Sequence, residues 1–366
     1  MNALVNRKHQ VVLIAPGSKG AHESNLLRSL GADYIPLKAH ILGTSATKSI
    51  VYPLRLIDTI RDADRRFKFD VIHFVNYSTN LLVYPLIRRF SRAPVVSDLH
   101  ALASLRQTEP TVNEPLVSWA IGLVFEEMAL RFSDVIITPT DELRNVLARR
   151  FAHPRNIFAV PNCVWTGEPS LDRLVKTAAR EDRSAESTIF FHANFLPSSS
   201  SVKRSLRELE RLKEVLRQIT ARGQNVKLWL AGPGVSALSH DRVEPVVYLG
   251  YVEDPLAYLL RSDLVILPVR DRTLGIHSRL VEAMIAGKPV VATREACCGL
   301  FPHIRRSGIT ICESLKEMAE SACSILEDSR RMKMLGERNR RVAEELFSSS
   351  RVGMQLEHAY SVALSG

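Results

Sequence analysis

Short apolar runs rich in valine and isoleucine alternate with longer amphipathic segments along this sequence, and this alternation limits the fold more than any other feature. In the first half, such runs predict buried strands at residues 10–15, 70–75, 94–97, 135–139 and 157–161. Helical patterns separate them, at residues 22–30, 53–67, 114–132 and 140–151. Continuous apolar runs of this length are typical of parallel strands covered on both faces. Strands alternating with helices therefore predict a parallel α/β sheet.

The alternation stops between Thr166 and Ser187, a charged stretch that contains Pro169 and predicts a linker. It restarts at Thr188, with strands predicted at 189–192, 226–231, 246–248, 264–268 and 289–292, and helices at 205–222, 254–261, 278–286, 315–328, 330–346 and 352–364. The sequence thus predicts two doubly wound Rossmann-like domains, 1–165 and 188–346, joined by the linker 166–187. The remaining residues, 347–366, are predicted to form a C-terminal helix that is a candidate to pack back on the first domain.

Size and charge agree with two soluble domains and point to an anionic partner. The chain has 366 residues, which suggests about two domains at roughly 150 residues each. A hydrophobic content of 46% excludes disorder as the main state. Lysine and arginine exceed aspartate and glutamate by 49 − 39 = 10, which favours a phosphate-bearing substrate, an acidic lipid surface or nucleic acid. No aromatic interleaving or nucleic-acid motif accompanies the charge, which argues against nucleic acid.

Cysteines and apolar stretches bear on metal binding and location. The five cysteines form no Cys-x-x-Cys pair, which argues against zinc. The N-terminus lacks the apolar core of a signal peptide, and the longest apolar stretch, 115–125, is about half the length of a membrane helix. We therefore predict a cytoplasmic protein whose membrane contact, if any, is peripheral to the inner face of the cell membrane. Basic groups at residues 61–68 and 88–92 are either a solvated face or a docking site for anionic lipid.

The segment 271–293 carries the clearest signs of a ligand site. Ligands of parallel sheets bind outside the carboxyl ends of strands, and with two domains we expect the site in the cleft between them. Here a strand is followed by a loop with Gly275, where the backbone can approach a ligand closely. The N–H groups of Ile276, His277 and Ser278 then open a helix and form an anion site that suits a diphosphate.

Two side chains on this predicted helix add to the site. Arg279 brings a cation to the first turn, and Glu282 lies one turn further, where its carboxylate can accept hydrogen bonds from two vicinal hydroxyls. An ionised carboxylate on an otherwise apolar helix needs partners, which favours ligand binding by Glu282 over a purely structural role. For His277 the structural alternative, capping the helix, is the simpler one.

The string Glu-Ala-Met-Ile-Ala-Gly-Lys-Pro-Val-Val-Ala-Thr, from Glu282 to Thr293, resembles the donor-site signature of retaining glycosyltransferases of the GT-B fold, in particular family 4. Four other segments resemble the same family in order and spacing: 160–164 (Val-Pro-Asn-Cys-Val), 228–234 (Leu-Trp-Leu-Ala-Gly-Pro-Gly), 248–252 (Tyr-Leu-Gly-Tyr-Val) and 98–100 (Asp-Leu-His). The resemblance therefore spans nearly the whole chain.

The resemblance implies a nucleotide-sugar co-substrate held mainly by the second domain and a glycan, lipid-linked or small-molecule acceptor held mainly by the first. Transfer with retention is expected without a metal ion or other cofactor. By this resemblance, Glu282 binds the ribose hydroxyls, the amides from Gly275 to Ser278 meet the distal phosphate and sugar, and Tyr251 and Val252 lie by the base. His100 faces the transferred sugar, although it can equally be a core histidine. Stabilisation of the leaving group is then electrostatic.

The sequence departs from the family pattern in three places. Leu274 stands where the first carboxylate of a Glu-x7-Glu motif is expected, so that role passes to backbone groups, to Asp271, or is lost. Gly275, Arg279 and Glu282 fit the family's Gly-x-x-x-Lys/Arg-x-x-Glu variant instead. The phosphate cation expected after the first strand of the donor domain is either Lys203 or Arg204.

The third departure is at the N-terminus. The stretch 9–12 matches the family's second strand, so the opening strand is expected either upstream of Met1 or missing from the acceptor wall. With Leu274, this supports an alternative in which the chain is a non-catalytic relative that binds a nucleotide or a partner protein. A third alternative, an epimerase of the same fold, requires further acid and base groups, and the sequence offers no clear set.

Overall fold

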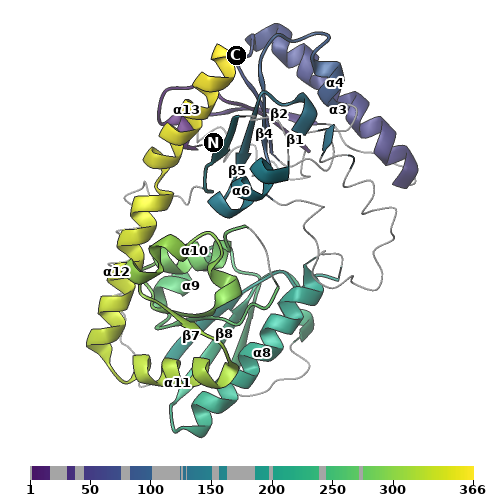
Figure 1. Cartoon of the computed structure of the whole chain (residues 1–366). Coiled ribbons are helices and arrows are strands. Elements are labelled where there is room, and N and C mark those ends of the chain that lie inside the picture. The colour runs from purple at the N-terminus through teal and green to yellow at the C-terminus, as the bar shows by residue number, and fades with distance from the viewer. Residues whose placement is uncertain are drawn as a thin grey trace. The chain divides into compact units, whose positions relative to one another are not determined.

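The computed structural model divides the chain into two compact units, Met1–Cys163 with Ser349–Gly366, and Val164–Ser348 (Figure 1). The residues it describes are 2–16, 31–37, 45–75, 83–100, 124, 127–128, 130–150, 156–162, 186–197, 201–238, 245–271 and 275–366. Several predicted features lie outside them: residues 166–185 of the predicted linker 166–187, the helix at 22–30, most of the helix at 114–132, Leu274 and Cys163. Among the described helices, none has the length and apolar character needed to cross a bilayer.

The first unit contains parallel strands with helices packed on them. A pair, β1 (Val12–Pro16) and β2 (Asp33–Leu37), accompanies a four-stranded sheet in the order β3 (Ile72–Val75), β4 (Val95–Asp98), β5 (Val135–Thr138) and β6 (Asn156–Ala159). The helices are α1 (Asn2–Val5), α3 (Ser45–Phe67), α4 (Val83–Ile87), α6 (Asp141–Arg150) and α13 (Ser349–Ser365). The last of these, α13, buries Val352, Ala359 and Ala363 against Val96 and Ile137 of the sheet.

The second unit is a doubly wound parallel sheet. The strands β9 (Val246–Gly250), β8 (Val226–Ala231) and β7 (Ser187–His192) pair in that order, as do β10 (Val265–Leu267), β11 (Val290–Thr293) and β12 (Ile309–Cys312). A bridge between Ile189 and Leu264 joins the two sets. The helices are α8 (Val202–Ala221), α9 (Pro255–Arg261), α10 (Ser278–Ile285), α11 (Leu315–Leu326) and α12 (Ser329–Phe347), with short 3-10 helices at Val235–Leu238, Arg294–Cys297 and Phe301–Arg306.

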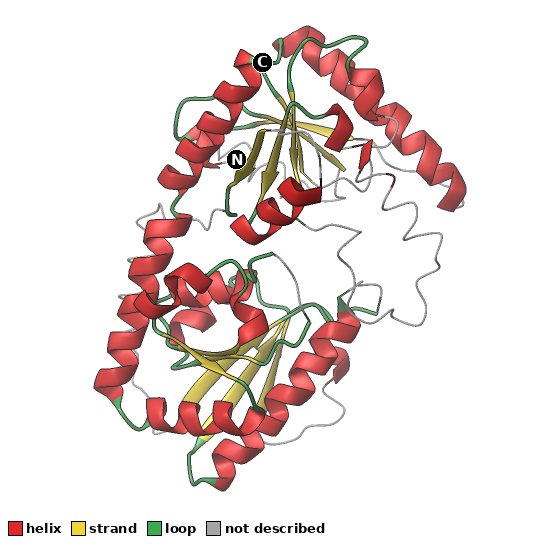
Figure 2. Cartoon of the chain, in the orientation of Figure 1, coloured by secondary structure: helices red, strands yellow, loops and turns green. Residues whose placement is uncertain are grey.

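Alternate residues of the central strands enter two different cores, one on each face of this sheet. On β7, Phe190 packs with α10 and α12, whereas Ile189 and Phe191 pack with α8 and α11. Figure 2 shows the strands enclosed between helices in this way. Strands buried on both faces explain the continuous apolar runs in the sequence.

The predicted α/β class with parallel sheets is confirmed, but several element boundaries and short elements were wrong or missed. The helix expected from Pro53 begins at Ser45, so Pro53 lies inside it. A helix can continue past a proline when packing outweighs the one hydrogen bond that the proline removes. The strand β2 was not predicted, since Asp33 and Pro36 interrupt its apolar pattern. The strand β12 and the helix α4 were also missed; each is only a few residues long.

Candidate functional site

The carboxyl end of β7 and the helix α10 bring His192 and Glu282 together. His192 is the last residue of β7, and its Nε2 lies 2.7 Å from Oε2 of Glu282. The Glu282 side chain remains 34% exposed, so its carboxylate has one oxygen on the histidine and surface left for a ligand. Sequence reasoning identified Glu282 but missed His192; the signal that marks it is a polar side chain at the carboxyl end of a parallel strand.

The N-terminus of α10 follows directly from His277. His277 is the N-cap residue (φ −72°, ψ 117°), and its side chain makes no capping hydrogen bond, so the first-turn amides are not capped by it. Burial lowers the pKa of His277 to about 4, helped by the charges of Arg279 and Arg204. This histidine is therefore neutral at pH 7 and adds no charge of its own to the helix start.

The two candidate phosphate cations on α8 differ in placement. Lys203 is exposed, whereas Arg204 is half-buried and lies close enough to His277 to lower its pKa. Of the alternatives that the sequence left open, Arg204 is thus the one whose charge acts at the start of α10.

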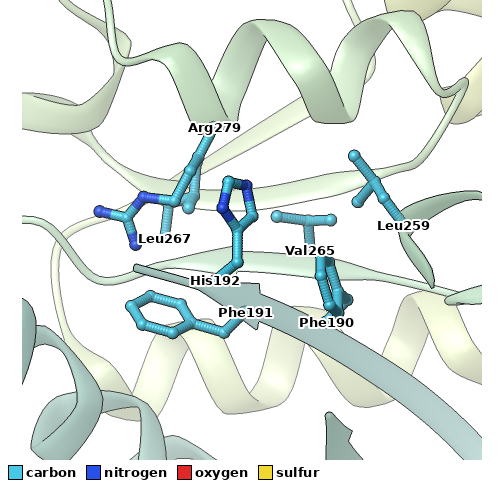
Figure 3. Close-up of a pocket in the computed structure, with 7 residues that line it drawn as sticks. All are labelled: Phe190, Phe191, His192, Leu259, Val265, Leu267 and Arg279. Atoms are coloured by element: carbon cyan, nitrogen blue, oxygen red, sulfur yellow. The ribbon is translucent and has the colours of Figure 1, made fainter. Parts of the chain in front are cut away.

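The Arg279 side chain packs against α8 and β7 within the second unit. Its Nη2 forms an ion pair with Oε2 of Glu208 on α8, and its guanidinium lies over the Phe191 ring, 4.6 Å from the centroid. The Glu208 side chain is 2% exposed and that of Arg279 15%. Figure 3 shows Arg279, Phe191 and His192 at a small, mostly apolar cavity that is also lined by Phe190, Leu259, Val265 and Leu267. Asp271, the other acidic candidate, has Arg207 3.6 Å away.

Two glycines fix the loop that follows His192. Gly232 has φ +132°, and a Cβ there would lie 2.0 Å from the carbonyl oxygen of Ala193; at Gly234 it would lie 2.6 Å from the backbone of Phe195. Backbone hydrogen bonds join Ala193 N–H to Ala231 O and Phe195 N–H to Pro233 O. The glycine turn that follows β8 therefore supports the end of β7 through direct backbone contact.

The residues predicted to lie by a base follow β9, two strands from β7 in the sheet. Tyr251 is 71% exposed, and Val252 packs on the core of this unit. The turn before them depends on Gly250, whose φ is +75°.

A second group of polar residues gathers in the first unit, after β4. Nε2 of His100 lies 3.3 Å from Oδ2 of Asp98, and Nδ1 of His100 lies 3.4 Å from the amide nitrogen of Asn162. The hydrogen bond to Asp98 raises the pKa of His100. On the other side of Asp98, His73 of β3 has its Nε2 3.9 Å from the same oxygen and its Nδ1 2.7 Å from the hydroxyl of Tyr360 on α13. Sequence reasoning named His100 but neither His73 nor Tyr360.

Family models match most of the chain. Residues 1–168 match the model described as Glycosyltransferase Family 4, and residues 187–328 match Glycosyl transferases group 1. A curated relative, N-acetyl-alpha-D-glucosaminyl L-malate synthase of Bacillus anthracis, is 23% identical over 84% of this chain and 79% of its own length.

Solved structures share the fold over the full length. Sucrose-phosphate synthase from Thermosynechococcus elongatus is similar with a TM-score of 0.69 at 15% identity, covering 98% of this chain and 90% of that one. The Anabaena protein HepE, solved in complex with UDP-glucose, is similar with a TM-score of 0.68 at 16% identity, covering 96% and 99%.

Proposed function

The chain belongs to the glycosyltransferases of the GT-B fold that resemble family 4, and from this we propose that it transfers a sugar, with retention, from a nucleotide-sugar donor to an acceptor hydroxyl. The observation that carries the proposal is the pairing of Glu282 with His192, at the carboxyl end of a parallel strand and one turn inside α10. Oε1 of Glu282 and the amides at the start of α10 then meet a ribose and a diphosphate respectively.

We propose a uridine nucleotide as the first donor to test, because HepE was solved with UDP-glucose. The second unit supplies the donor contacts, with Tyr251 and Val252 toward the base and Arg204 toward the phosphates. In the first unit, His100 is the candidate for contact with the transferred sugar. Because the start of α10 and the cation of Arg204 can stabilise the negative charge of the leaving diphosphate, we propose that transfer requires no metal ion.

The basic groups of the first unit give little support to a lipid-docking face. Arg61 is paired with Asp58 at 2.7 Å, Arg65 has Asp62 3.9 Å away, and Arg88 is paired with Asp134. Arginines whose charge is partly neutralised by a neighbouring aspartate favour a solvated face over a lipid-docking site.

Thermal stabilisation of the full chain by UDP, GDP, ADP and UDP-glucose tests the donor site. A ligand at a hundred times its dissociation constant adds about 2.7 kcal/mol to the free energy of unfolding. We expect UDP to raise the melting temperature of the wild type and of Glu337→Ala, an exposed glutamate on α12, but not of Glu282→Ala. The variant His192→Gln, which keeps a hydrogen-bond donor, should retain part of the shift. Equal shifts in Glu282→Ala and wild type would remove Glu282 from the site.

Turnover separates an enzyme from a non-catalytic relative. Release of UDP from UDP-sugars, with and without oligosaccharide acceptors and with a chelator present, is measured on the wild type. Release that resists the chelator supports a metal-free transferase, and the anomeric configuration of the product, read by NMR, tests retention. Binding of UDP without any release would instead favour the nucleotide-binding relative.

A further inference from the structure

Asp98 in the first unit is flanked by two imidazoles, and one of them is tied to the C-terminal helix. Nε2 of His100 lies 3.3 Å from Oδ2 of Asp98, and Nε2 of His73 lies 3.9 Å from the same oxygen. The hydroxyl of Tyr360, on α13, lies 2.7 Å from the far nitrogen of His73. We propose that Tyr360 and His73 are positioning residues that orient the Asp98 carboxylate for its contact with His100. The inference rests on the proposed function only for the role of His100.

The protonation states of the chain of contacts follow from burial. Burial, with the charge of Asp98, raises the pKa of Tyr360, so its hydroxyl stays protonated. Burial lowers the pKa of His73 despite the attraction of Asp98, so this imidazole is neutral and carries one N–H. A neutral imidazole that accepts from Tyr360 at Nδ1 must carry its proton on Nε2, which faces Asp98.

His73 and Asp98 each carry a buried polar atom without a hydrogen-bond partner. Nε2 of His73 and Oδ1 of Asp98 are both buried and have no hydrogen-bond partner. Nε2 of His73 lies 3.9 Å from the other carboxylate oxygen, Oδ2, which is too far for a hydrogen bond but close enough for its N–H to be attracted by the buried charge. The other tautomer of His73 would set a lone pair against the carboxylate. Tyr360 therefore selects the tautomer that attracts Asp98.

The consequence reaches His100 through Asp98. Among the described residues, the titratable groups near His100 are Asp98 on β4 and, beyond it, His73 on β3, while Asn162 after β6 contacts its Nδ1 without charge. The hydrogen bond with Asp98 raises the pKa of His100, so its charged form persists to higher pH than in a free histidine. If Asp98 loses its orientation, we expect the pKa of His100 to fall toward that of a free histidine.

The simpler account is that Tyr360 only packs α13 against the sheet. Its ring meets that of His73 edge-on, with centroids 5.8 Å apart, and α13 shares a core with the strands. The chain offers a matched control: the hydroxyl of Tyr84 is also buried and bonds, at 2.8 Å, to Ser97, the residue before Asp98. Loss of either hydroxyl removes a hydrogen bond beside the strands that carry Asp98 and His73, but of these two bonds only that of Tyr360 is to His73.

The test is an NMR titration of the full chain labelled with ¹³C at the histidine Cε1 positions, with the His100 signal assigned by its loss in His100→Gln. Asp98→Asn should lower the His100 midpoint toward that of a free histidine. Tyr360→Phe should lower it in the same direction, and Tyr84→Phe should leave it at the wild-type value. Should Tyr360→Phe fail to fold, His73→Leu replaces it, with the same expected lowering.

An unchanged His100 midpoint in Tyr360→Phe or His73→Leu, or an equal change in Tyr84→Phe, overturns the proposal. The titration needs no substrate. Its outcome is therefore distinguishable from failure of the proposed function, which is read by nucleotide stabilisation and UDP release.

Discussion

At the scale of single residues, the polar side chains of the candidate site owe their placement to partners far away in sequence. Arg279 shows this best. The sequence indicated a cation for a bound phosphate, whereas the structure pairs it with Glu208, 71 residues earlier. A local pattern shows which residues end a strand or open a helix, and so it identified Glu282 and His277. It cannot show which distant side chain a residue meets, and so it missed Glu208, His73 and Tyr360.

The pair of Glu208 and Arg279 gives a prediction about stability. Glu208→Gln leaves the Arg279 guanidinium without its counter-charge in a buried position, so we expect the free energy of unfolding to fall by about 3 kcal/mol. Glu210→Gln on the same helix removes only an exposed pair with Lys213, and we expect a change within about 0.5 kcal/mol. Urea denaturation measures both. If the free energy of unfolding fell by similar amounts in the two variants, burial of the Glu208–Arg279 pair would not increase its contribution to stability.

At the scale of elements, strands buried on both faces were easier to predict than short elements or elements that contain proline. Strands buried on both faces appear in the sequence as valine- and isoleucine-rich runs, and nearly all were found. The predicted helix 140–151 is present as α6, and Thr140 caps it, with its hydroxyl accepting from the N–H of Leu143 at 3.1 Å. Elements that depend on tertiary packing were missed or misplaced, among them β2, β12 and the start of α3, because their local patterns are too short or are interrupted by proline.

The contact between α1 and α13 gives a prediction about pH. Arg7 and His9, which follow α1, both bond to Glu357, and these bonds lower the pKa of Glu357 to about 2. The ionised carboxylate is therefore favoured in the folded chain. The stability it adds is present above its ordinary pKa of 4.5 and is lost as pH falls from there toward about 2.

Thermal unfolding between pH 7 and pH 3 measures this effect. We expect Glu357→Gln to melt below the wild type at neutral pH, and the difference to shrink as the pH falls below about 4.5. Glu344→Gln, which removes a glutamate paired with Arg340 on α12, serves as the control for loss of an ion pair in the other unit. A difference that stays constant across this range would contradict a role for the carboxylate charge of Glu357.

At the scale of the whole molecule, the chain completes its first unit with its last helix. Alternating strands and helices were enough to predict two α/β domains, because each domain repeats the same local pattern. The place of the final helix could only be a conjecture from sequence. An amphipathic helix shows that it needs a partner surface but not which one, and here the surface is formed by β4, β5 and the residues after β6.

This arrangement predicts that the first unit can be unfolded from the C-terminus while the donor site survives. Ala359 is fully buried on α13 and shares a core with Val96, Val135 and Ile137; the two cores of the second unit contain none of these residues. Ala359→Asp places an unpaired charge in that core and should unfold the first unit. Because Glu282 and His192 belong to the second unit, we expect UDP still to stabilise that unit.

Scanning calorimetry with and without UDP, together with limited proteolysis, follows each unit separately. Leu364→Asp, an exposed position on the same helix, is the matched control and should leave both units intact. In Ala359→Asp we expect early cleavage within residues 1–163 and a remaining transition that still shifts with UDP. Loss of the UDP shift in Ala359→Asp but not in Leu364→Asp would mean that the donor site depends on the first unit. Wild-type behaviour of Ala359→Asp would mean that α13 is not needed to hold the first unit together.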